Sequence, residues 1–568
     1  MKSDLLVRIR VISGIVFLVA IILIGRLYFV QIMHGEDFSN DADRQYTKSG
    51  QDLYSRGSIF LNDKDGRLVS GATLRSGFTV AISPKDLNNE EEVYEQLSTL
   101  IEIDQDTFFL RAGKKNDPYE EIAKRVDSDT AHAIEDLEIK GVNIYKDRWR
   151  FYPGENLAAQ TLGFVGFIGD DFAGRYGLER YYNDVLERNN DGMYVNFFAE
   201  IFANINSAVF KKGNRSGDVV VSIEPSVQLF LENKLAEVNG EWNSKQTAGV
   251  IINPQNGEIY ALGVYPNFNV NEFGEEESSS IFSNPIVESV YEMGSIIKPL
   301  TMVAGVDAGA VTATTTYYDH GSIELSDYTI SNFDGEGRGR VPMQEVLSQS
   351  LNTGVAFVVG EMGNKRFADY MLSFGVGDET GIDLPNESAG LVDNLDSPRD
   401  LEYATASFGQ GIAMTPISTV RALSVLANGG NLITPHLAKK IKYTSGLSKT
   451  PTFQDERVLK EESTEEVTRM LVNVVDDALL GGTVKLDNYS VAAKTGTAQI
   501  ADEEFGGYYE DKFLHSFFGY FPAYDAQYLV FLYTVEPKEV RYASQTLTHP
   551  FMDTVKFLIN YYEVPPDR

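Results

Sequence analysis

Residues 295–299 read Ser-Ile-Ile-Lys-Pro, and this stretch decides how the rest of the chain is interpreted. A serine and a lysine three positions apart lie on one face of a helix, so we expect the Ser295 hydroxyl to face the Lys298 amine. Because proline is tolerated in the first turn of a helix, Pro299 predicts a helix that begins at Ser295. The positive end of that helix's dipole would favour an alkoxide on the serine.

Two later motifs complete a pattern with this pair. Ser350-Leu351-Asn352 is an S-x-N motif, and Lys494-Thr495-Gly496-Thr497 is a K-T-G-T motif inside a strand-like run, residues 491–500. Each motif alone is weak, and the similar Lys48-Ser49-Gly50 stands on the wrong side of the serine. The ordered triple, each motif in its own context, is typical of serine-lysine acyltransferases, the penicillin-binding proteins and class A β-lactamases.

The sequence around these motifs predicts an α+β domain. Apolar runs at residues 247–252 and 258–264 flank an Asn-Pro-Gln-Asn-Gly turn, and 516–521 pairs in the same way with 527–535. These are antiparallel hairpins at the two ends of a mostly helical region, so we expect one sheet that closes through distant parts of the chain. The helices expected between them cover residues 299–306, 344–351, 365–374, 415–427 and 464–478.

The part before residue 212 reads as an extended mixed module with short strands and one helix, residues 128–137. Asp63-Lys64-Asp65-Gly66 predicts a hairpin turn, in which Gly66 supplies a positive φ. A Gly/Asn/Ser-rich run at residues 211–217 marks a domain boundary. The acidic segment 269–280 lacks periodicity and is interpreted as a solvated loop.

A membrane anchor is predicted at residues 11–33. The run is apolar apart from Arg26 and Gln31, and as a helix it is about 34 Å long, enough to cross a hydrocarbon core of about 30 Å. Basic residues precede it and acidic residues follow it, which places the N-terminus in the cytoplasm and the remainder outside. The alternative is a cleaved secretory signal, against which no small-x-small site follows the run.

Composition excludes several functions for the 568-residue chain. Asp and Glu number 82 against 49 Lys and Arg, and a net charge of -33 repels nucleic-acid phosphates. The absence of cysteine excludes disulfides, thiolate nucleophiles and iron-sulfur clusters. The six histidines are scattered, with no pair at i, i+4, so we expect neither a metal site nor a cofactor.

The motifs in their surroundings resemble class B penicillin-binding proteins over almost the whole chain. In the catalytic part the resemblance rests on residues 291–299, 380–385, 409–416, 494–499 and 516–522. In the N-terminal part it rests on Arg56-Gly57-Ser58-Ile59, Arg150-Phe151-Tyr152-Pro153 and Tyr176-Gly177-Leu178-Glu179. Met293, Ile296-Ile297 and Leu351 depart from the usual residues, which puts the shape of the pocket in doubt but removes no reacting group.

The resemblance implies a fold and a division into domains. The fold is α+β, with a single N-terminal transmembrane helix, an extended mixed α/β pedestal and a transpeptidase domain whose antiparallel sheet is flanked by helices. The expected parts are a cytoplasmic tail (1–10), a signal anchor (11–33), a pedestal or dimerisation-like domain (34–212) and the transpeptidase domain (213–568).

The resemblance also implies the chemistry, which is D,D-transpeptidation of peptidoglycan. Ser295 is the expected nucleophile, Lys298 its base and Ser350 a proton relay. Asn352 would hold the substrate peptide, while Lys494, Thr495, Gly496 and Thr497 would form the site for its terminal carboxylate. An oxyanion hole is expected from the backbone N–H groups of Ser295 and Thr497. Lys298 would stay neutral because of burial and the nearby charge of Lys494.

The implied partners are stem peptides ending in D-Ala-D-Ala, an acceptor amine, β-lactams as inhibitors, a SEDS-family membrane glycosyltransferase and other division or elongation proteins. Arg26 and Gln31 are candidate contacts for the glycosyltransferase, with snorkelling as the alternative. The amino-acid sequences of the motifs, taken together, favour the septal type. An elongation-type enzyme, a D,D-carboxypeptidase or β-lactam hydrolase, and a non-catalytic division scaffold stay as alternatives, although the E-x-x-L-N motif of class A lactamases is absent.

Overall fold

The structure is a computed structural model that describes residues 54–168, 171–188, 216–325, 328–502, 504 and 506–568. The described residues form two compact units: one contains residues 54–55 and Leu74–Trp149, and the other contains Arg56–Thr73 and the described part of Arg150–Arg568. The predicted anchor, the Lys48 motif and the predicted boundary at 212/213 lie outside the described residues. No helix within the described part is long and apolar enough to cross a membrane.

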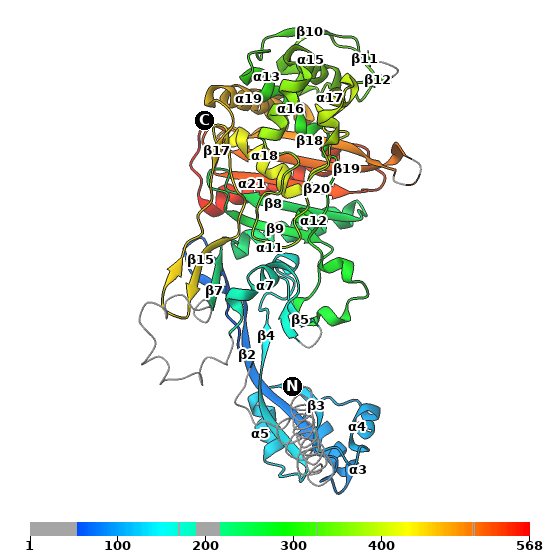
Figure 1. The fold of residues 1–568 in the computed structure, drawn as a ribbon, viewed down its shortest axis with the longest axis vertical. Helices are drawn as coiled ribbons and strands as arrows, with labels where there is room; N and C mark the ends of the chain where they lie inside the picture. The colour runs from blue at the N-terminus through cyan, green and yellow to red at the C-terminus, as the bar shows by residue number, and fades with distance from the viewer. Residues whose placement is uncertain (1–53, 169–170, 189–215, 326–327, 503, 505) are drawn as a thin grey trace, which may run out of the picture. The chain divides into compact units, whose positions relative to one another are not determined.

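A five-stranded antiparallel sheet is the centre of the second unit (Figure 1). Its order is β18 (Ala492–Ala501), β19 (Tyr508–Phe521), β20 (Tyr528–Val535), β8 (Gln246–Ile252) and β9 (Ile259–Tyr265). Both predicted hairpins are present, and Val530 pairs with Ile251, which confirms a sheet closed between distant segments. β18, which carries the K-T-G-T motif, lies at the edge.

Helices cover both faces of this sheet. All eight residues of β20 are buried, because its alternating side chains enter two different cores. Val530 and Leu532 pack in one core with residues of α11 (Pro225–Glu241) and α21 (Thr548–Tyr562). Phe531 and Tyr533 belong to the other core, which includes residues of α13 (Lys298–Asp307) and α18 (Pro416–Ala427). The predicted sheet flanked by helices is therefore confirmed.

The predicted helices between the hairpins are also found, with ends shifted by a few residues. The last of them finishes in a π-helical turn, Val474–Ala478. The predicted helices are α13, α18, α14 (Met343–Ser348), α16 (Asn364–Ser373) and α19 (Glu461–Asn473). The other helices of this unit's later part are α12 (Pro285–Glu288), α15 (Asn352–Met362), α17 (Asp400–Ala406) and α20 (Ala543–Thr546). Small strand pairs are β10 (Thr316–Asp319) with β13 (Gly339–Pro342), β11 (Ser322–Leu325) with β12 (Tyr328–Ser331), and β14 (Asn431–Leu432) with β17 (Glu456–Arg457).

The N-terminal segment of the second unit begins with the predicted hairpin. β1 (Ile59–Asn62) pairs with the start of β2 (Leu68–Ile82), and Gly66 has φ +80° in the turn. β1 also pairs in parallel with β7 (Gly217–Val221), which continues to β15 (Ala438–Tyr443) and β16 (Ser448–Lys449). Short elements nearby are α6 (Ala159–Leu162), β5 (Val165–Ile168), β6 (Asp171–Gly174), α7 (Gly177–Tyr181) and α8 (Asn183–Leu186).

The three N-terminal motifs meet at one buried carboxylate, that of Glu179. Arg56 Nε lies 2.6 Å from Glu179 Oε2, and Arg150 Nε lies 2.5 Å from Oε1, with these three side chains 2% exposed or less. The Tyr152 hydroxyl donates to Oε1 at 3.2 Å. Residues separated by up to 123 positions are thus joined by a charged cluster.

The first unit has more helix than the sequence predicted. The second half of β2 pairs with β3 (Glu120–Val126) and β4 (Val142–Phe151), and the helices are α3 (Glu90–Ser98), α4 (Gln105–Ala112) and α5 (Ser128–Glu135). Only α5 was predicted, so the expectation of one helix was wrong. α3 buries just Val93 and Leu97, and two apolar residues in an acidic stretch give too weak a periodicity to recognise.

The acidic segment 269–280 is not a plain solvated loop. It contains the 3-10 helix Val270–Glu275, and a second one covers Ser279–Phe282. Val270 is fully buried, and the Phe273 ring stacks on Phe164 with centroids 4.1 Å apart. Isolated apolar residues among the acidic ones therefore anchor the segment in the core. The acidic composition gave no indication of this packing.

Candidate active site

Ser295 lies in a 3-10 turn, Gly294–Ile297, and α13 begins only at Lys298. The predicted helix start at Ser295 was therefore wrong by one turn. Gly294 has φ +66°, which interrupts a regular helix, and Pro299 occupies the first turn of α13. In a 3-10 turn residues i and i+3 eclipse, so Ser295 and Lys298 still project to one side.

The residues before Ser295 are held from two directions. The Ser516 hydroxyl of β19 donates to the Met293 carbonyl at 3.0 Å. The Glu292 carboxylate accepts from the Gly411 N–H at 3.0 Å and from the Tyr508 hydroxyl at 2.8 Å. These bonds fix the serine turn against the sheet and against residues 409–411.

The two motif lysines are both buried. Lys298 is 0% exposed and Lys494 is 4% exposed, and their amines each lie 3.1 Å from Ser350 Oγ. Burial, with the charge of Lys494 as a second cause, holds the Lys298 pKa well below its ordinary value. Burial lowers the Lys494 pKa to about 8. Lys298 is thus electrostatically suited to be a neutral amine.

Ser350 links the two lysines from a strained position between α14 and α15. Its φ of +55° is in the left-handed region, which costs a non-glycine residue about 1–3 kcal/mol. In this conformation both its carbonyl oxygen and its hydroxyl accept from Lys298. Strain of this kind is concentrated at functional sites, which supports a role for this hydroxyl in proton transfer.

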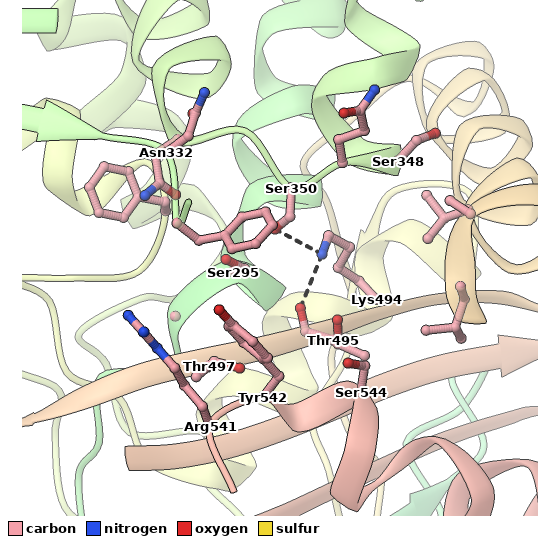
Figure 2. A pocket seen from close by; sticks show the side chains of 18 of the residues that line it. Ser295, Asn332, Ser348, Ser350, Lys494, Thr495, Thr497, Arg541, Tyr542 and Ser544 are labelled. Carbon is pink, nitrogen blue, oxygen red and sulfur yellow. Dashed lines mark hydrogen bonds between the residues drawn. The ribbon is translucent and has the colours of Figure 1, made fainter. Parts of the chain in front are cut away.

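These groups border one open cavity of about 660 Å³ (Figure 2). The predicted site residues that line it are Ser295, Ser350, Asn352, Lys494, Thr495 and Thr497. Lys298 and Gly496 are not part of the lining: Lys298 contacts Ser350, and a Cβ at Gly496 would lie 2.8 Å from the Met293 carbonyl oxygen. The three motifs, whose first residues are up to 199 positions apart in the sequence, therefore lie together in space.

Individual contacts refine the predicted roles. The Asn352 amide donates to the Ser331 carbonyl at 2.8 Å, which orients the side chain beside the cavity. Thr497 Oγ1 accepts from the Ala543 N–H at 3.0 Å, so its own hydrogen can still be donated to a ligand. Ser295 Oγ makes no hydrogen bond to a described residue.

The residues that depart from the family pattern do not line the cavity. Met293, Ile296, Ile297 and Leu351 are 1% exposed or less, and none of them lines it. They pack in the apolar core instead. The surface of the cavity therefore contains none of the residues that depart from the family pattern.

Several lining residues were not among the predicted site residues, although Gly294, Gln410 and Gln499 lie in motif stretches. They are Ser331, Asn332, Phe333, Arg338, Ser348, Gln349, Phe408, Gln410, Val474, Ala478, Leu479, Leu480, Gln499, Phe513, Arg541, Tyr542 and Ser544, with Gly294 from the serine turn. Most come from loops and helix ends, where neither periodicity nor spacing distinguishes a binding residue from a surface one.

Ser295 and Lys494 line one open cavity, and a second serine hydroxyl there lies beside two buried lysines, an arrangement that fits a serine-type acyltransferase. The penicillin-binding protein transpeptidase domain model matches residues 247–555, more than half of the chain, and the penicillin-binding protein dimerisation domain model matches residues 53–221. The chain belongs to the penicillin-binding protein transpeptidase family, as a class B member with a dimerisation domain before a transpeptidase domain.

Individual relatives agree with this assignment. The chain is 29% identical to stage V sporulation protein D of Bacillus subtilis, over 97% of this chain and 85% of the relative. It is 28% identical to the peptidoglycan D,D-transpeptidase MrdA of Acinetobacter baumannii, over 86% of this chain and 77% of the relative. Penicillin-binding protein 2X of Streptococcus thermophilus has the same fold, with a TM-score of 0.72 and 21% identity. The match covers 90% of this chain and 81% of that chain.

Proposed function

We propose that this class B enzyme crosslinks peptidoglycan stem peptides through an acyl-enzyme on Ser295. The observation that carries the proposal is the shared approach of Lys298 and Lys494 to Ser350 Oγ beside the cavity that Ser295 lines. The relatives named peptidoglycan D,D-transpeptidases support the same reaction.

The first half-reaction forms the acyl-enzyme. Ser295 Oγ attacks the carbonyl of the penultimate D-Ala, and its proton passes to the neutral Lys298 amine. The C–N bond to the terminal D-Ala breaks, and the leaving nitrogen takes a proton that Lys298 returns through the Ser350 hydroxyl. Lys494, Thr495 and Thr497 hold the terminal carboxylate, while the N–H groups of Ser295 and Thr497 stabilise the oxyanion.

The second half-reaction transfers the acyl group. An amine of a neighbouring stem peptide attacks the Ser295 ester, gives its proton to Lys298, and Ser295 Oγ leaves and recovers a proton. A new amide bond joins the two peptides and the enzyme is regenerated. No cofactor enters either step, because the electrons and protons balance within the motif residues.

The test is covalent labelling of the whole 568-residue chain with benzylpenicillin, with the modified residue and adduct lifetime read by mass spectrometry. We expect a long-lived adduct on Ser295 that Ser295→Ala abolishes. Rapid turnover of the adduct would instead indicate a hydrolase. A chain that forms no adduct and does not act on D-Ala-D-Ala peptides would support the scaffold alternative.

The cellular setting that we propose is the division septum, with the anchor at residues 11–33 in the cell membrane and the catalytic part outside. The amino-acid sequences of the motifs, taken together, support the septal type. The identity to a relative named for sporulation favours wall synthesis in sporulating cells as a second candidate. Imaging a fluorescent fusion decides: midcell signal supports the septum, lateral signal the elongation type, and signal confined to sporulating cells the second candidate.

The partner that we propose is a SEDS-family membrane glycosyltransferase, contacted through Arg26 and Gln31. Polar side chains in a membrane span need a partner that satisfies them. We expect Arg26→Leu combined with Gln31→Leu to abolish co-purification of the two proteins, while Leu23→Ala leaves it unchanged. Co-purification that persists in the double variant would contradict these contacts.

A further inference from the structure

The active-site cavity has a charge opposite to that of the chain. Its charged lining residues are Arg338, Lys494 and Arg541, and no described carboxylate lines it, although acidic residues outnumber basic ones by 82 to 49 in the sequence. A cavity with one sign of charge concentrates ligands of the other sign. The terminal carboxylate of a donor peptide accounts for one of these cations, Lys494.

Arg338 is already neutralised by its neighbours. Its guanidinium forms two bonds to the Asp334 carboxylate, at 2.6 and 2.9 Å, and its Nε donates to Gln349 at 2.9 Å. A bidentate pair of this kind satisfies the charge and most of the donors of an arginine. Arg338 therefore has a structural partner without any ligand.

Arg541 has no such partner. Its side chain forms no ion pair with any described residue. The guanidinium carbon lies over the ring of the neighbouring Tyr542, 5.7 Å from the ring centroid. Figure 2 shows the two side chains extending side by side from one loop at the cavity. A guanidinium keeps its charge at any physiological pH and presents donors in a planar fork that matches a carboxylate.

The loop that carries Arg541 is fixed to the sheet. The carbonyl of Arg541 lies 3.0 Å from His515 Nε2, and because a carbonyl only accepts, Nε2 carries the proton. His515 is fully buried and pairs with Thr497 across β18 and β19. The Ala543 N–H, two residues after Arg541, donates to Thr497 Oγ1. The backbone of the loop that carries the guanidinium is thereby tethered beside Thr497.

The direction of β18 indicates which part of a donor peptide reaches this position. Thr495, Thr497 and Gln499 line the cavity, and alternate residues of a strand are about 7 Å apart. A peptide with its terminal carboxylate at Thr495 and its reacting carbonyl at Ser295 extends its earlier residues past Thr497. The residue that precedes D-Ala-D-Ala then lies beside Arg541.

We propose that Arg541 binds a second carboxylate of the donor peptide, carried by the side chain of the residue that precedes D-Ala-D-Ala. Arg541 is thus a specificity-determining residue that distinguishes a free carboxylate from an amide at that position. The inference rests on the proposed function, because it takes a D-Ala-D-Ala peptide as the donor.

The test uses two synthetic peptides ending in D-Ala-D-Ala that differ only by a carboxylate or a carboxamide on the preceding side chain. Each is titrated as a competitor of benzylpenicillin labelling of Ser295 on the whole chain. We expect the carboxylate peptide to protect at about tenfold lower concentration, the range of a hydrogen bond to a charged group. Arg541→Gln should bring the ratio close to one, and Arg541→Lys should restore part of it.

Arg340→Gln is the matched control, because Arg340 is exposed on β13 and does not line the cavity. It should keep the wild-type ratio. Equal protection by the two peptides, no protection by either, or a ratio that Arg541→Gln leaves unchanged would overturn the inference. Failure of the proposed function is distinguishable, since Ser295 of the wild-type chain would then either take no label or lose it rapidly.

Discussion

Lys298 and Lys494 approach the same atom, Ser350 Oγ, each at 3.1 Å. Both amines are buried, and two ammonium groups so close together without a carboxylate would repel each other strongly. The pKa of each lysine is lowered by burial, and that of Lys298 is lowered further by the charge of Lys494. The arrangement therefore favours one neutral amine and one cation at a single hydroxyl.

Lys298→Arg should remove the base while it keeps the positive charge. A guanidinium cannot lose its proton in a protein, so we expect the rate of Ser295 acylation by benzylpenicillin to fall by about 100-fold or more. Single-turnover labelling followed by mass spectrometry measures the rate. Lys245→Arg, at a side chain that is 72% exposed, is the control and should acylate normally. An unchanged rate in Lys298→Arg would assign the base elsewhere.

The acylation rate should depend on pH with a bell shape. The rate rises as Lys298 loses its proton, at a pH well below the ordinary lysine value, because only the neutral amine accepts the proton of Ser295. It falls above about pH 8, where Lys494 loses the charge that binds the substrate carboxylate. The second-order rate constant of β-lactam acylation across pH measures both limbs.

Lys494→Gln should change the rising and the falling limb of this pH dependence in different ways. Without the charge of Lys494 the pKa of Lys298 rises toward its ordinary value, so the rising limb moves to higher pH and the falling limb disappears. A rising limb that stays in place or moves to lower pH would show that the two amines are not coupled.

Glu179→Ala should destabilise the second unit severely. The substitution leaves the guanidinium groups of Arg56 and Arg150 buried without their carboxylate, and such a loss costs about 3–5 kcal/mol. Calorimetric unfolding of the variant measures the change. Glu465→Ala removes an exposed ion pair with Arg469 and should cost less than about 1 kcal/mol. Equal effects of the two substitutions would contradict a structural role for the buried cluster.

Local chemistry made much of this fold predictable. Turn residues identified the hairpins at Gly66, at residues 253–257 and at residues 522–526, and the ordered motifs identified the groups that meet at the cavity. In each case a short stretch of sequence carries its own conformational signal, such as a positive φ or a pair of residues at helical spacing.

What the sequence did not reveal depends on contacts between distant segments. Arg541 looks like any exposed charge until the bonds from His515 and to Thr497 place its loop at the cavity. The left-handed conformation of Ser350 has no signal in Ser-Leu-Asn, and it is found in the short connection between α14 and α15. Glu179 belonged to a quoted motif, yet its two arginine partners follow only from the folded chain.

Gly496 of the K-T-G-T motif tests how tightly the strand and the serine turn must fit. A Cβ at this position would lie 2.4 Å from Ser516 Oγ and 2.8 Å from the Met293 carbonyl oxygen, and backbone at that distance cannot simply rotate away. Gly496→Ala should therefore push β18 away from the Ser295 turn and widen the gap between Ser295 and the Thr497 N–H.

A displacement of about 1 Å at a catalytic group costs about 100-fold in rate, so benzylpenicillin labelling of Gly496→Ala should slow by that order. Gly240→Ala is the matched control, because it lies in α11 with no atom within 4 Å of the added Cβ. Gly240 is in the last turn of α11, so alanine there should leave labelling unchanged and stabilise the chain by less than about 0.5–1 kcal/mol. If Gly496→Ala labels at the wild-type rate while it melts normally, the close approach of β18 to the serine turn is not needed for acylation.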